Sequence, residues 1–172
     1  MTADDRRDDA SDAGDATDAG GTYTLLLERA DAGTITVGAL GTVHLPAGAY
    51  AYVGSALGTG GFARVDRHRR VAAGDHDTRH WHVDYLTGDE QTRLVDVVTS
   101  AGVEAECRIA DGIRRRLTSD EATATGSPAG PETVPVADFG ASDCGCRAHL
   151  FGHESVERLA TVVSTVHDAV DS

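Results

Sequence analysis

Short runs of β-type residues, separated by glycine-containing turns, fill much of the first hundred residues of this chain. Alternating apolar and polar residues of this kind, rich in valine, threonine and tyrosine, are typical of half-buried strands. The turn at residues 30–33 further predicts that the first two runs pair as a hairpin. The runs lie at residues 22–28, 34–37, 42–45, 49–53, 81–86 and 93–98.

Three other stretches have the apolar spacing of amphipathic helices, at residues 62–72, 104–117 and 153–170. Strands gathered in the first part of a chain, with helices around and after them, predict an α+β fold. We therefore expect a small, mainly antiparallel β-sheet flanked by helices. The length of 172 residues and the 40% hydrophobic content suit a single domain.

Two segments differ in composition from the rest. Residues 1–20 hold seven aspartates and two arginines without an apolar pattern, which predicts a disordered acidic tail. Residues 118–132 are rich in Ser, Thr, Ala, Gly and Pro, which predicts a flexible insertion. The folded domain is thus expected to span residues 21–171.

The net charge is −13, from 28 acidic and 15 basic residues, and every basic residue is an arginine. Such an acidic, lysine-free chain suggests an organism with a very salty cytoplasm, where surface carboxylates keep proteins soluble; an ordinary acidic bacterial protein is the alternative. Nucleic-acid-binding proteins usually carry a basic surface. At molar salt, however, the screening length is about 3 Å, so local contacts outweigh the net charge.

The three cysteines are too few for a secreted disulfide scaffold. No apolar run approaches the roughly 20 residues that span a bilayer, and the acidic N-terminus lacks the pattern of a signal peptide. These features predict a cytoplasmic protein.

Three short motifs carry the functional signal: Gly21-Thr-Tyr23, Tyr52-Val-Gly54 and an arginine-rich stretch that begins at Arg64 and includes His68. With them, the chain resembles the GIY-YIG nuclease superfamily, which has two such strand motifs, a helix with an essential arginine and a later helix with a metal-binding glutamate. Glu106 stands where that glutamate is expected.

The resemblance is closest to an archaeal branch known as domain of unknown function 123, and it extends from about Gly21 to Phe151. Two features depart from the superfamily pattern. The spacer between Tyr23 and Tyr52 is unusually long, as an extra hairpin over residues 34–45 would explain, and no asparagine follows the catalytic glutamate in the usual way. The signatures of the branch are residues 52–58, Arg67-His68, residues 80–86, Glu106-Cys107 and residues 142–150.

The resemblance implies a metal-dependent endonuclease, with DNA the favoured substrate and DNA repair a fitting role. Hydrolysis of a phosphodiester needs an activated water, a counter-charge for the phosphorane and help for the leaving oxygen. Arg64 would bind the scissile phosphate and Glu106 would hold Mg²⁺ or Mn²⁺. Tyr23, Tyr52 and His68 are all candidates for moving the proton of the water.

Residues expected to contact nucleic acid are Ser55, Arg67, Arg69, Arg70, His80 and His82. Two other functions remain open for such a domain. One is a nucleic-acid-binding module with reduced catalysis, and the other is a protein-interaction domain whose arginines contact an acidic partner.

On a strand, His80, His82 and Asp84 would share one face. We expect that face to border the active site. The alternatives are a metal site, or a polar face in which Asp84 orients a histidine.

Cys107, Cys144, Cys146 and His149 offer four ligands suited to tetrahedral zinc. The alternative is that the thiols are reduced, buried and pack the C-terminal motif. Because Cys107 adjoins Glu106, folding the Cys144 segment onto that helix would also fix the glutamate.

Overall fold

The computed structural model describes residues 20–121, 139, 145–146 and 148–172. A four-stranded antiparallel sheet runs in the order β5-β1-β4-β6, and β2 and β3 form a separate two-stranded sheet. The α+β fold with a flanked antiparallel sheet is confirmed. The strands are β1 (Gly21–Arg29), β2 (Gly33–Val37), β3 (Gly41–Leu45), β4 (Gly48–Ser55), β5 (Thr92–Ala101) and β6 (Leu150–His153), with a 3-10 turn, η1 (Gly38–Leu40), between β2 and β3; the helices are α1 (Ala63–Ala72), α2 (His82–Thr87), α3 (Glu106–Glu121) and α4 (Val156–Asp171).

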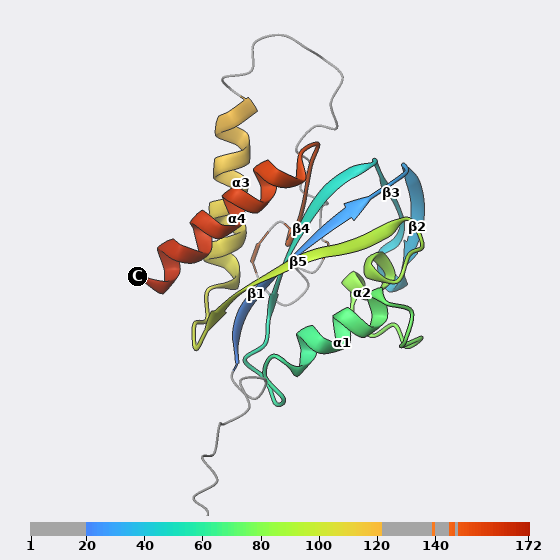
Figure 1. Cartoon of the computed structure of the whole chain (residues 1–172), viewed down its shortest axis with the longest axis horizontal. Helices are drawn as coiled ribbons and strands as arrows, with labels where there is room; N and C mark the ends of the chain where they lie inside the picture. The colour runs from blue at the N-terminus through green and yellow to red at the C-terminus, as the bar shows by residue number, and fades with distance from the viewer. Residues whose placement is uncertain (1–19, 122–138, 140–144, 147) are drawn as a thin grey trace, which may run out of the picture.

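The sheet separates two apolar cores. Alternate residues of β1 point to opposite faces, so Leu25 and Leu27 belong to one core and Leu26 to the other. The first core is closed by α1, α2 and the β2–β3 hairpin, and the second by α3 and α4. Figure 1 shows α3 and α4 crossing one side of the sheet, with α1, α2 and the hairpin toward the other.

The predicted hairpin between residues 22–28 and 34–37 is wrong. β1 is apolar on both faces and lies in the interior of the sheet, paired with β4 and β5. β2 pairs instead with β3, and this hairpin is the insertion expected from the long spacer between Tyr23 and Tyr52.

The predicted strand over residues 81–86 is also wrong, because this segment forms helix α2. The carboxylate of Asp84 accepts hydrogen bonds from the backbone N–H groups of His80 and Trp81, at 2.8 and 3.0 Å. These bonds cap the start of the helix, so a residue that seemed to alternate along a strand begins a helical turn instead.

The C-terminal elements differ in detail from the prediction. Strand β6, which the sequence did not suggest, pairs with β4 at the sheet edge. Helix α4 therefore begins at Val156, where the Ser155 hydroxyl accepts from the N–H of Arg158 at 3.2 Å. Helix α3 continues to Glu121, into the expected insertion, and the remainder of residues 118–132 lies outside the described residues. Residues 1–19 of the expected tail over residues 1–20 lie outside them too.

Helix α4 is fixed to the sheet by a buried polar contact as well as by its apolar face. His167 lies between the hydroxyls of Thr24 on β1 and Ser100 on β5, each 2.8 Å from one ring nitrogen. Burial lowers the pKa of His167, which favours the neutral ring. Over the described ranges of the chain, no helix is long and apolar enough to cross a bilayer.

Candidate functional site

Tyr23 and Gly54, from the two strand motifs, face each other across β1 and β4. A Cβ on residue 54 would lie 2.5 Å from the Tyr23 hydroxyl oxygen, so the ring occupies the space that any side chain would need. The glycine of the second motif thus allows the tyrosine of the first to lie flat against β4. The motifs form one packed unit at the start of β1.

A chain of hydrogen bonds runs inward from the Tyr23 hydroxyl. That hydroxyl is 2.9 Å from Nε2 of His68 on α1, and Nδ1 of His68 is 3.1 Å from Oδ1 of Asp84 on α2. All three side chains are buried. An ionised carboxylate only accepts, so Nδ1 of His68 carries the proton, and in the neutral ring Nε2 accepts from Tyr23.

The charge state of this chain follows from its surroundings. Burial alone would raise the pKa of Asp84, but hydrogen bonds from His68, from the Trp81 and His80 backbone and from Arg67 outweigh it and hold that pKa well below its usual range. Asp84 is therefore ionised at neutral pH. It forms an ion pair with Arg67 at 2.8 Å and orients His68.

Tyr23 is held in its neutral form. Burial is the main cause of its raised pKa, and the nearby Tyr52, Glu106 and Asp84 raise it further, while Arg64 lowers it. These electrostatic effects place Tyr52, Arg64 and Glu106 within interaction range of the Tyr23 hydroxyl. The structure therefore brings together the five residues predicted to be catalytic.

Two arginines of α1 lie over the indole ring of Trp81. The guanidinium carbons of Arg64 and Arg67 are 4.6 and 4.5 Å from the ring centroid, within the range of a cation–π contact. Arg64 also donates to the backbone carbonyl of Ser55, at 2.5 Å. Arg67 donates to the carbonyl of Thr78, at 2.9 Å. Both guanidinium groups are thus held in place at the edge of the site.

Glu106 and Tyr52 reach the site from the other elements. Glu106 opens α3, is about one quarter exposed, and its Oε1 lies 2.9 Å from Nδ1 of the buried His149. Tyr52 on β4 makes an edge contact with the Phe139 ring. Both tyrosines of the motifs are therefore buried and belong to the first core rather than to open surface.

The residues predicted to contact nucleic acid fall into two groups. Arg69 and Arg70 are exposed on α1, and Arg69 pairs with Asp66 at 2.8 Å on the same helix. His80 is exposed beside Trp81, and His82 is half-buried against Phe139.

The predicted strand face shared by His80, His82 and Asp84 does not exist, because helix α2 replaces the strand. Of the alternatives, Asp84 does orient a histidine, but the histidine is His68.

The cysteine cluster is only partly described. Cys107 and Cys146 form a disulfide, so the expectation of reduced, buried thiols is wrong for this pair. Cys107 is exposed and Cys146 is half-buried. Cys144 lies outside the described residues. The ligand atoms of Cys107, Cys146 and His149 lie within 4.8 Å of one another.

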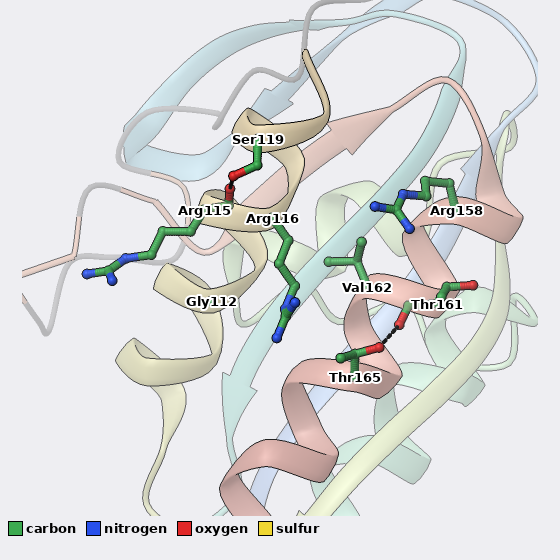
Figure 2. Close-up of a pocket in the computed structure, with 8 residues that line it drawn as sticks. All are labelled: Gly112, Arg115, Arg116, Ser119, Arg158, Thr161, Val162 and Thr165. Carbon is green, nitrogen blue, oxygen red and sulfur yellow. Dashed lines mark hydrogen bonds between the residues drawn. The ribbon is translucent and has the colours of Figure 1, made fainter. Parts of the chain in front are cut away.

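A second polar surface lies on the far side of the sheet, between α3 and α4. This groove of about 410 Å³ is lined by Arg115, Arg116 and Arg158, with Val162 among the residues between them. Figure 2 shows Arg116 and Arg158 directed into the groove and Arg115 directed away. The run of three arginines at residues 114–116 is its signal in the sequence.

The family described as Domain of unknown function DUF123 matches residues 22–172. No curated protein and no solved structure gives a significant match. Since the family match covers nearly all of the sequence, the chain belongs to the DUF123 family.

Proposed function

We propose that this domain hydrolyses phosphodiester bonds in nucleic acid, with DNA the favoured substrate, as a member of the GIY-YIG nuclease superfamily. The observation that carries the proposal is the buried chain from the Tyr23 hydroxyl through His68 to Asp84, with Arg64 beside it. A phosphodiester hydrolase needs such a proton path next to a fixed cation.

The raised pKa of Tyr23 argues for a relay rather than a preformed tyrosinate. As water attacks phosphorus and the bond to the leaving oxygen breaks, the Tyr23 oxygen accepts a proton from the water while its own proton passes to Nε2 of His68. The leaving oxygen takes its proton from solvent. The His68 ring then becomes an imidazolium that the ionised Asp84 stabilises. Asp84 is in this account a positioning residue, which the sequence suggested only as a partner for an unspecified histidine.

Arg64 supplies the positive charge for the phosphate. Its guanidinium is already held by the Ser55 carbonyl and the Trp81 ring, so little conformational freedom remains to be lost on binding. Tyr52 lies within electrostatic range of Tyr23 and would help to place the water.

Glu106 fits a hard divalent cation such as Mg²⁺ or Mn²⁺. Its carboxylate is partly exposed, with Oε1 the oxygen 2.9 Å from His149, so an ion whose remaining ligands are water and phosphate could be reached by the other oxygen. Such an ion would supply charge stabilisation at the phosphorane oxygens.

A binding module without catalysis is the second candidate. It is favoured by the two arginines over Trp81, which would hold a phosphate backbone even if no bond were cut. The arginine-lined groove between α3 and α4 is the competing surface for such binding, but it has neither a tyrosine nor a histidine among its lining residues.

Paired variants separate these functions. Arg64→Ala should weaken both cleavage and DNA affinity, because it removes the phosphate contact. Glu106→Gln should keep most of the affinity while cleavage falls by about 10²–10³, the usual effect of losing a transition-state charge contact. The assay uses plasmid, flapped and single-stranded DNA with Mg²⁺ or Mn²⁺ in concentrated KCl.

Arg116→Ala is the matched control, since it removes an arginine from the other side of the sheet. It should leave cleavage and affinity unchanged. If the wild-type protein binds DNA but never cuts it, and Arg64→Ala abolishes binding, the binding module is correct. If only Arg116→Ala weakens binding, the site described above is not the nucleic-acid surface.

A further inference from the structure

We propose that Cys107, Cys146 and His149 bind a zinc ion when the protein is reduced. Their ligand atoms already lie within 4.8 Å of one another. Zinc–sulfur bonds of about 2.3 Å and zinc–nitrogen bonds of about 2.0 Å place two ligands of a tetrahedral ion roughly 3.5–4 Å apart. Only small movements are therefore needed to close the three ligands around one ion, with water or another donor in the fourth position.

His149 lies beside a carboxylate, as many metal-ligating histidines do. It is buried, and its Nδ1 lies 2.9 Å from Oε1 of Glu106. Histidines that bind zinc usually donate their other ring N–H to a carboxylate, which fixes the ring and increases its basicity. Glu106 lies close enough to take this part for His149 once the ring binds the ion through Nε2.

The disulfide and the zinc site are alternative states of the same sulfur atoms. A dithiol reductant supplies two electrons and two protons to the Cys107–Cys146 bond, giving two thiols and an oxidised reductant. Zinc then displaces the two thiol protons, because only thiolates bind it. Cys107 is exposed, so the bond can be reached by a reductant.

The site has a structural consequence that does not depend on the proposed nuclease function. Cys107 stands in the first turn of α3, while Cys146 and His149 precede β6, so one ion would join the second core to the sheet edge. Glu106 would be linked to the ion through His149. Its position would then respond to the state of the cysteines.

Cobalt(II) provides the direct probe, because tetrahedral cobalt with thiolate ligands gives visible and charge-transfer absorption bands. The full-length protein, reduced and freed of excess reductant, should bind one equivalent of Co²⁺ with these bands, and Zn²⁺ should displace it. The disulfide form should show none. Cys107→Ser and His149→Gln should each lose the tetrahedral spectrum, whereas His153→Gln, a histidine nearby that hydrogen-bonds Ser155 instead, should keep it.

Glu106→Gln should still bind, but about 10–100-fold more weakly, because the carboxylate partner of His149 is lost. Oxidation of the zinc-loaded wild-type protein by a low-molecular-weight disulfide should release the metal as the thiols disappear, a test that needs no variant. Reduced protein that binds no Co²⁺, or a Cys107→Ser variant with an unchanged spectrum, would overturn the proposal. None of these readouts involves DNA, so the nuclease can fail while the zinc site stands, and the reverse.

Discussion

The Tyr23 ring lies against Gly54 so closely that a single methyl group on residue 54 would meet its hydroxyl at 2.5 Å. Both residues are held in register by the pairing of β1 with β4. The hydroxyl that Gly54 admits is the one that reaches His68. The two strand motifs are therefore joined by packing as well as by hydrogen bonds between strands.

Gly54→Ala should consequently displace the Tyr23 ring and lengthen its contact with His68. Overpacking of this kind costs about 1–3 kcal/mol of unfolding free energy, measurable by chemical denaturation. Gly58→Ala is the matched control, because the nearest atom to its added Cβ is 4.0 Å away and its φ is not positive. Equal stability of the two alanine variants would show that the packing around residue 54 is looser than described.

Much of this fold could be predicted from the sequence, because the apolar spacing within most elements matches the faces that those elements bury in the folded protein. The strands β1 to β5 and the helices α1, α3 and α4 show the expected periodicities. The pairing of β1 could not be predicted from its neighbouring turn, because three consecutive leucines suit an interior strand whose partners are remote in sequence.

The residues of the candidate site, too, could be predicted only in part from the sequence. Tyr23, Arg64, His68 and Glu106 were predicted through the resemblance of the motifs to the GIY-YIG superfamily. The role of Asp84 was not, because it depends on contacts with His68 and Arg67 across two helices. The six residues of α2 are too few for periodicity to distinguish helix from strand, and the backbone bonds to Asp84 decide the outcome.

Asp84 should contribute stability that depends on pH. Its pKa in the folded protein lies below the ordinary aspartate value near 3.9, so its stabilisation is fully present above that pH and is lost as the pH falls below it. Asp84→Asn should lower the unfolding free energy by about 1.5–3 kcal/mol at pH near 7, the usual contribution of hydrogen bonds to a charged group.

The difference between wild type and Asp84→Asn should then begin to shrink as the pH falls below about 4, because the carboxyl group of the unfolded chain protonates first and the folded one only at lower pH. Denaturation curves at a series of pH values measure it. A difference that stays constant or grows on acidification would mean that Asp84 is not held as a carboxylate.

The acidic composition predicts a requirement for salt. With a net charge of −13, repulsion between carboxylates is strong at about 0.1 M KCl and is largely screened at about 3 M. Circular dichroism across a KCl series should show structure gained with salt. A melting temperature that is the same at both ends of the series would contradict the halophilic interpretation.

The central claim is that the Tyr23 hydroxyl takes part in phosphodiester cleavage, and Tyr23→Phe tests it most directly. The substitution keeps the ring that packs on Gly54 and removes only the oxygen bonded to His68. The measurement is the cleavage rate of wild type and Tyr23→Phe on the same DNA, with Mg²⁺ in concentrated KCl. The account predicts that the variant folds and binds DNA like wild type, but cuts about 10²–10⁴-fold more slowly. A Tyr23→Phe protein that cuts as fast as wild type would show that the proton path described here is not the one used.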